Sequence, residues 1–156
     1  MEIVGARGPA GPPKERLAAV RRLGAVQLLD ARLVLGRDHL LTAADHAERA
    51  MREGTNVAKT LAVEFVVYAS GERQIGDALA KMGIRDTTTE FAVVVFGGDP
   101  AAVLDALRLT RDDAVLAFHR QKAKEYGFTD LELDSVPPDR VSDLVLERVA
   151  LVDLTK

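Results

Sequence analysis

Apolar residues recur at helical spacing in several segments of the chain. Leu17, Val20 and Leu23 lie three residues apart in segment 14–23, which follows Pro13, a residue suited to the first helical position. Segment 37–53 shows the clearest pattern, because its apolar side chains fall on one helix face and Gly54 follows directly. These side chains are Leu40, Ala43, Ala44, Ala47 and Met51. We expect helices over both segments.

Other segments show the alternating or continuous apolar pattern that is typical of strands. Residues 2–7 predict a short strand, 25–36 a strand broken near Asp30, and 61–69 (LAVEFVVYA) a further strand. Segment 91–96 (FAVVVF) is apolar at every position, which predicts a central strand covered on both faces.

Further helices are predicted from their faces and their ends. Ile75, Ala78, Leu79 and Met82 share one face of a helix. Asp99 is suited to cap a second helix, and Pro100 is suited to its first position. The predicted helices are therefore 72–82 and one that begins at Asp99-Pro100, and two further helices are predicted at 111–126 and 140–154.

Strands interleaved with helices around one sheet predict the fold class. We expect an α/β (α+β) fold, with one central mixed sheet flanked by helices and an irregular stretch at 129–139. The chain has 156 residues, 47% apolar and 29% charged, which is enough for one globular domain with its own core. We therefore expect a single domain over residues 1–156.

The amino-acid composition excludes several classes of site and of protein. The chain has no cysteine, which excludes disulfides, thiolate metal sites and cysteine nucleophiles. A net charge of −3 argues against coating a long nucleic acid, although a local contact with a nucleic-acid end needs only a few cations. No segment has the apolar length of a signal peptide or of a membrane span of roughly 20 residues. We expect a soluble cytoplasmic protein without a membrane partner.

No catalytic or metal motif is present. His39 and His46 are seven residues apart, or about 10 Å along a helix, which is too far for one metal ion. The glycine-rich loops ARGPAGPP and FGGDPA match neither G-x-G-x-x-G nor the P-loop pattern, and neither G-x-S-x-G nor H-E-x-x-H occurs. We expect no catalytic residue, no metal and no cofactor.

Two polar residues of the middle segments need an explanation. Glu64 interrupts the apolar run 61–69, and a position facing solvent is the favoured interpretation, since buried carboxylates are rare. Alternatively it pairs with Lys59 or Arg73 and shapes a polar pocket. Arg73 lies near the predicted start of helix 72–82, where the helix dipole favours anions. It is either an ordinary surface arginine or the site where an external anion binds.

The last predicted helix is apolar around most of its circumference. Arg140, Asp143 and Glu147 form only a narrow charged stripe. Such a helix must be covered on more than one side, either by its own domain or by a partner protein. Both interpretations stay open from the sequence, and the candidate partner contacts are Val149, Leu151, Val152 and Leu154.

Three stretches together resemble one family: HLLTAADHAERA (39–50), NVAKTLAVEFVVYASGERQIGDALAKMGI (56–84) and VLERVALVDL (145–154). They resemble the small non-catalytic subunit of the KEOPS (EKC) complex, the TPRKB-like, PRPK-kinase-binding protein family, in its archaeal form. The similarity covers most of the chain, and E-x-x-x-x-A-S-G-x-R-Q-I, from Glu64 to Ile75, is its most specific part.

The resemblance implies a single α/β domain that is not an enzyme. It implies a regulatory subunit that binds the small atypical kinase/ATPase of the complex, which makes threonylcarbamoyladenosine (t6A) at position 37 of tRNAs. It also implies help in recruiting tRNA through the single-stranded 3′ CCA end. The candidate tRNA-binding residues are then Arg73, Gln74, Lys59 and Arg7.

A second hypothesis is a small-molecule-binding or enzymatic α/β domain with a pocket near Glu64, Ser70 and Arg73. The absence of a nucleophile–base or metal motif favours the first hypothesis over this one.

Overall fold

The computed structural model describes residues 1–156, with eight α-helices and a four-stranded sheet. The chain forms two compact units. The sheet unit comprises Met1–Arg32 and Gly83–Ala117, and the helical unit comprises Leu33–Met82 and Phe118–Lys156. The α+β class predicted from the sequence is confirmed. No helix combines the length and the apolar character that crossing a membrane would require.

The sheet is antiparallel throughout, so the predicted mixed sheet is wrong. Its strands are β1 (Glu2–Arg7), β2 (Val26–Asp30), β3 (Glu90–Val95) and β4 (Thr110–Arg111), in the order β2-β3-β1-β4. β1 and β2 are joined by helix α1 (Pro13–Arg21) and run in the same direction, but β3 lies between them and pairs antiparallel with both. β1 and β2 are therefore not hydrogen-bonded neighbours, although a single helix joins them.

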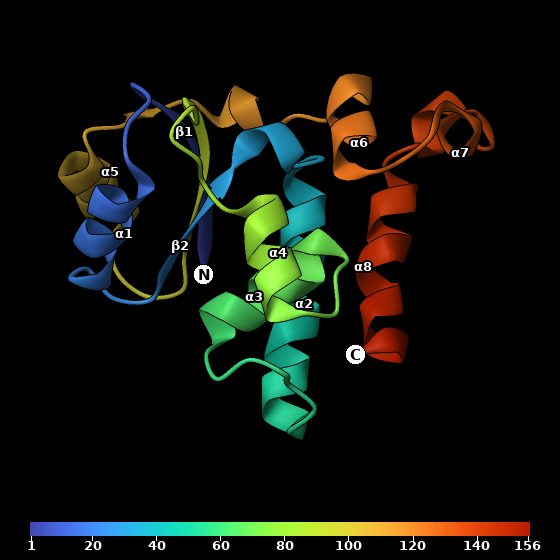
Figure 1. The fold of residues 1–156 in the computed structure, drawn as a ribbon, viewed down its shortest axis with the longest axis horizontal. Coiled ribbons are helices and arrows are strands. Elements are labelled where there is room, and N and C mark those ends of the chain that lie inside the picture. The colour runs from blue at the N-terminus through green and yellow to red at the C-terminus, as the bar shows by residue number, and fades with distance from the viewer. The chain divides into compact units, whose positions relative to one another are not determined.

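One core of the sheet unit lies between the sheet and two helices. Val20 of α1 packs with the apolar side chains of α5 (Pro100–Leu107) on this face, and Figure 1 shows both helices on the same side. The strand side chains of this core are Val4, Ala6, Leu28, Phe91, Val93 and Val95. β3 is buried from Phe91 to Val95, which confirms the prediction of a central strand. Asp99 caps α5 by accepting the Ala101 N–H at 3.0 Å, also as predicted.

Helix α3 (Leu61–Ser70) is the most enclosed element of the helical unit. Every residue from Glu64 to Ser70 is buried. It packs against α2 (Arg37–Glu53), α4 (Ile75–Met82) and α8 (Asp143–Thr155), which Figure 1 shows around it. The unit is completed by α6 (Arg120–Tyr126), α7 (Asp130–Asp134) and the 3₁₀ turn Pro138–Arg140.

The predicted strand at 61–69 is wrong, because this segment is helix α3. The Thr60 hydroxyl caps its start by accepting the Val63 N–H at 3.3 Å, and Gly71, with φ of 72°, ends it. A helix buried on all sides lacks a polar face. Its sequence therefore shows the same continuous apolar run as a buried strand.

Smaller differences concern element ends. The strand at 25–36 stops at Asp30, where a 3₁₀ turn follows, and only 120–126 of the segment 111–126 is α-helical. The irregular stretch 129–139 contains α7, which starts with a capping box between Thr129 and Glu132. The helices at 37–53 and 140–154 are confirmed as α2 and, with its start at Asp143, α8.

Side chains from three other helices satisfy the carbonyl groups at the C-terminal end of α3. The Ala69 carbonyl accepts from His39 Nε2 and from the Tyr126 hydroxyl, each at 2.7 Å. The Ser70 carbonyl accepts from Lys81 Nζ, also at 2.7 Å. A helix end leaves such carbonyls without intrahelical donors, so these bonds allow the end of α3 to be buried.

The end of α3 provides a stability prediction. Gly54 and Gly71 both have a left-handed φ, but an added Cβ meets nothing within 4 Å at Gly54, whereas at Gly71 it meets Arg148 Cγ at 2.8 Å. Gly54→Ala should cost about 1–2 kcal/mol of unfolding free energy from backbone strain. Gly71→Ala should cost about 1–3 kcal/mol more from overpacking. Urea unfolding of both variants measures the two losses of unfolding free energy. Equal losses would show that an added Cβ is not crowded at Gly71.

Candidate functional site

The helical unit carries a surface hollow of about 480 Å³ next to its last residues. Three segments line it: the loop before α3, the turn that leads into α4, and the end of α8. We name it the C-terminal hollow, and its lining residues are Val57, Arg73, Gln74, Ile75, Gly76, Thr155 and Lys156. It therefore contains two of the predicted tRNA-binding residues, Arg73 and Gln74.

Arg73 and Gln74 precede α4, so the predicted helix start at residue 72 is wrong. The Ser70 hydroxyl accepts the Glu72 N–H at 3.0 Å, which holds the chain in a turn after Gly71. The helix starts at Ile75, and the Gln74 carbonyl accepts the Ala78 N–H at 2.9 Å. Arg73 and Gln74 are both exposed. The first N–H groups of α4 lack intrahelical acceptors, so an anion here would lie near both a helix start and a guanidinium.

The other two predicted tRNA-binding residues lie outside this hollow. Lys59 is exposed in the loop 54–60, two residues from Val57, but it does not line the hollow. Arg7 belongs to the sheet unit, at the end of β1, where its Nε donates to Asp112 at 2.7 Å.

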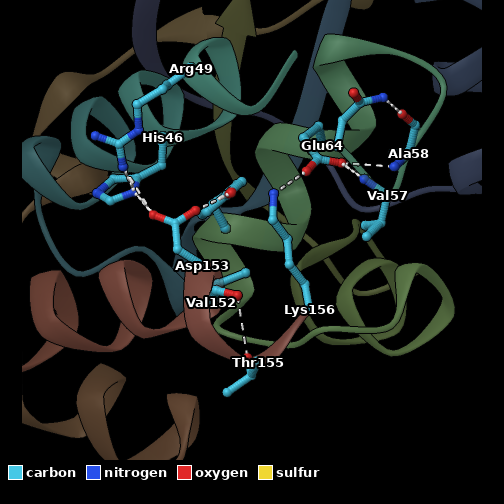
Figure 2. Close-up of polar contacts among 11 residues, drawn as sticks. His46, Arg49, Val57, Ala58, Glu64, Val152, Asp153, Thr155 and Lys156 are labelled. Atoms are coloured by element: carbon cyan, nitrogen blue, oxygen red, sulfur yellow. Dashed lines mark hydrogen bonds and ion pairs between the residues drawn. The ribbon is translucent and has the colours of Figure 1, made fainter. Parts of the chain in front are cut away.

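Glu64 is fully buried, which contradicts the favoured prediction that it faces solvent. Its Oε2 accepts the backbone N–H groups of Val57 at 3.0 Å and Ala58 at 2.8 Å, and its Oε1 accepts from Lys156 Nζ at 3.1 Å (Figure 2). The alternative partners Lys59 and Arg73 are also wrong, since the cation is Lys156, which lies 92 residues further along the chain. The Lys156 side chain is only 6% exposed, and its Nζ lies 4.5 Å from the centre of the Tyr68 ring.

A second polar cluster holds the last turn of α8 against α2 and α3. Asp153 accepts from the Tyr68 hydroxyl at 2.5 Å, contacts His46 Nδ1 at 2.7 Å and accepts from Arg49 Nη2 at 3.0 Å (Figure 2). Burial raises the pKa of the Asp153 carboxyl, but the hydrogen bonds from Tyr68, His46 and Arg49 outweigh it and leave that pKa below its usual value. Burial and the hydrogen bond to Asp153 raise the pKa of the Tyr68 hydroxyl. The charged form of Asp153 is thus the one that fastens α8.

The two histidines of α2 have separate structural partners. His39 is buried, accepts the Leu35 N–H at 3.0 Å through Nδ1 and donates from Nε2 to Ala69. His46 contacts Asp153. No group of three or more histidine, cysteine, aspartate or glutamate side chains is arranged to hold a metal ion.

The pocket of the second hypothesis is not assembled as predicted. Glu64 and Ser70 are both fully buried, and Ser70 Oγ donates to the Val67 carbonyl at 2.8 Å and accepts from Glu72. Of the three residues named for that pocket, Arg73 lines the C-terminal hollow, whereas Glu64 and Ser70 do not.

The structure divides the predicted partner contacts on α8 into two faces. Val149 and Val152 are buried in the helical unit, so their predicted role as surface contacts is wrong. Leu151 is 41% exposed and Leu154 is 80% exposed. A helix that looks apolar on nearly all sides thus buries one stripe and leaves two leucines on its outer face.

Sequence reasoning missed Val57, Thr155 and Lys156 as parts of the site. The buried carboxylate of Glu64 bonds to both Val57 and Lys156, and no spacing pattern connects these two residues in the sequence. The one available signal was Glu64 itself, because a carboxylate in an apolar run is either exposed or paired.

A comparison with known protein families identifies a match. The family model described as kinase binding protein CGI-121 matches residues 13–153. No curated protein matches the sequence significantly. The matched region includes α2, α3, α4 and almost all of α8, together with Arg73 and Gln74.

His39 predicts how stability depends on pH. Burial lowers its pKa from 6.5 to about 4, against the raising effect of its hydrogen bond to Ala69. Between these values the unfolded chain binds a proton that the folded chain does not, so stability should fall by about 3 kcal/mol as pH drops through this window. His39→Gln keeps a donor and an acceptor but does not titrate. The urea-unfolding free energy of His39→Gln should fall less steeply from pH 7 to pH 4 than that of the wild type. Parallel curves for the two proteins would show that His39 does not cause this pH dependence.

Proposed function

This chain belongs to the CGI-121 family of kinase-binding proteins, and from that premise we propose that it is a non-catalytic regulatory subunit of the KEOPS complex. In this role it binds the small atypical kinase/ATPase of the complex and helps to recruit tRNA through the 3′ CCA end, in the biosynthesis of t6A at position 37, in the cytoplasm. The observation that carries the proposal is the family match over residues 13–153.

The outer face of α8 is the proposed kinase-binding surface. Leu151 and Leu154 lie three residues apart on one helix, so their side chains are neighbours on the same face. Exposed leucines of this kind are suited to the apolar centre of an interface. The buried residues of α8 fasten the helix to the unit, so the exposed pair is presented on a fixed support.

The C-terminal hollow is the proposed tRNA contact. Arg73 supplies a cation for a phosphate, the start of α4 supplies N–H donors, and Gln74 supplies an amide for a base edge. A contact with one or a few nucleotides needs little positive charge, which is compatible with the net charge of −3. Lys59 on the neighbouring loop is a further candidate for a backbone contact.

The structural roles of Glu64 and Ser70 favour a binding subunit over the enzymatic alternative. Both side chains are fully buried and hydrogen-bonded to backbone groups of the helical unit. Neither is placed to meet a substrate, and no second observation supports a small-molecule pocket around them.

Kinase binding is tested by charge substitution on the outer face of α8. Leu154→Arg should weaken binding to the cognate KEOPS kinase by at least about tenfold, as expected for a central apolar contact, and Leu151→Arg should act in the same direction. Leu131→Arg is the matched control, because Leu131 is 82% exposed but lies on α7. Calorimetry with the purified kinase measures the affinities, and circular dichroism confirms folding. If Leu154→Arg is folded and binds the kinase as tightly as the wild type does, the kinase binds to another surface.

Arg73 is tested by the salt dependence of tRNA binding. Arg73→Ala should weaken binding similarly for all tRNA sequences and reduce the slope of log affinity against log salt by about 0.7, the value for one phosphate of a single strand. Arg52→Ala removes an exposed arginine from α2 and serves as the control.

The same assay with tRNA that lacks the CCA end locates the contact. Wild type and Arg73→Ala should then bind alike. An equal loss of affinity with and without the CCA end would mean that Arg73 touches another part of the tRNA, and unchanged binding in both assays would make it an ordinary surface arginine.

A further inference from the structure

One buried carboxylate connects two of the three segments that line the C-terminal hollow. Through Oε2 Glu64 holds the Val57 and Ala58 N–H groups, and through Oε1 it holds the ammonium group of Lys156 (Figure 2). Val57 and Lys156 are themselves lining residues. A single side chain therefore links these two walls directly.

The third wall is fixed to the same helix. Ser70, at the end of α3, accepts the Glu72 N–H and so holds the start of the turn that carries Arg73 and Gln74. All three segments around the hollow are thus tied to α3, which is buried from Glu64 onward and cannot shift easily.

Lys156 and Arg73 are both cations of the hollow, but their charges are not equally available. The Lys156 side chain is 6% exposed, and its ammonium lies on the Tyr68 ring and against the Glu64 carboxylate. Arg73 is exposed to solvent. The Glu64–Lys156 pair is neutral as a unit, so it offers no net charge to a phosphate, whereas the guanidinium of Arg73 does.

We propose that the buried Glu64–Lys156 ion pair positions the walls of the C-terminal hollow for a terminal nucleotide. Lys156 is then a positioning residue rather than a phosphate contact, and Arg73 is the residue that meets the phosphate. This inference rests on the proposed function, since it assigns roles within the same RNA site.

The positioning role is tested first without RNA. Lys156→Met removes the ammonium but keeps an unbranched side chain, which leaves a buried carboxylate without its cation. That carboxylate will draw in water, which weakens its hydrogen bonds to the loop. Hydrogen exchange of the Val57 and Ala58 amides should become at least about tenfold faster, in proportion to the population of the opened loop.

Two further variants separate positioning from general loss of stability. The double variant Glu64→Gln/Lys156→Met removes both charges and keeps an amide oxygen as acceptor, so it should restore slow exchange at these two amides. Leu133→Ala removes a buried side chain of α7 that does not line the hollow. In this variant the Val57 and Ala58 amides should be no less protected from exchange, compared with the other amides of the helical unit, than they are in the wild type. Unaltered exchange in Lys156→Met would overturn the inference.

The second arm uses a single-stranded RNA that ends in CCA, with any affinity tag placed at the N-terminus. At a temperature where every variant is folded, Lys156→Met should bind about tenfold more weakly with an unchanged salt slope, because no phosphate contact is lost. The double variant should regain the affinity, and Lys156→Arg should retain it. A reduced slope in Lys156→Met, with no recovery in the double variant, would show that Lys156 contacts phosphate and would overturn the inference. If wild-type protein fails to bind the RNA, the proposed function fails, while amide exchange still decides the role of the ion pair.

Discussion

The carboxylate of Glu64 has no contact with water, and the local structure of the helical unit depends on how it is compensated. A buried charge is tolerated only when it is paired and hydrogen-bonded, and leaving one without its partner costs about 3–5 kcal/mol. Glu64 meets this requirement with two backbone N–H groups from the loop before α3 and one ammonium group from the end of the chain. The loop and the chain end must therefore both reach α3. Val57 of this loop and Lys156 both line the C-terminal hollow.

At the C-terminal end of α3 the buried carbonyl groups also need hydrogen-bond donors, and both neutral and cationic side chains supply them. His39, Tyr126 and Lys81 satisfy the last carbonyls of the helix, and each comes from a different neighbouring helix. Burial lowers the pKa of Lys81, while its ion pair with Glu72 acts in the opposite direction. With these carbonyls satisfied, α3 can be buried at its C-terminal end. It then acts as the fixed support for α4, α8 and the site between them.

This arrangement would allow one small unit to present the two proposed binding surfaces on different sides. The inner face of α8 is fastened by Val149, Val152 and Asp153, and its last residue completes the hollow. Its outer face leaves Leu151 and Leu154 exposed. A kinase on the outer face and an RNA end in the hollow would therefore use different sides of the same helix.

Elements with a clear periodicity or a clear cap could be predicted from the sequence. Helix 37–53 and the start of α5 follow from a one-sided apolar pattern and from Asp99-Pro100. Segment 61–69 could not be assigned by periodicity, since a fully enclosed helix and a fully enclosed strand are apolar at the same positions. The capping box of Thr129 and Glu132 was readable in the sequence but was overlooked. Arg73 stood out through its place near the predicted start of helix 72–82, and the resemblance made it and Gln74 candidates for RNA binding. The contact of Lys156 with Glu64 has no counterpart in the sequence pattern. The most direct test of the whole account is amide chemical-shift mapping of the labelled protein with a single-stranded RNA ending in CCA. The account predicts shifts around Val57, Arg73 to Gly76 and Lys156, with Leu151 and Leu154 unaffected. Shifts centred on the outer face of α8 would contradict it.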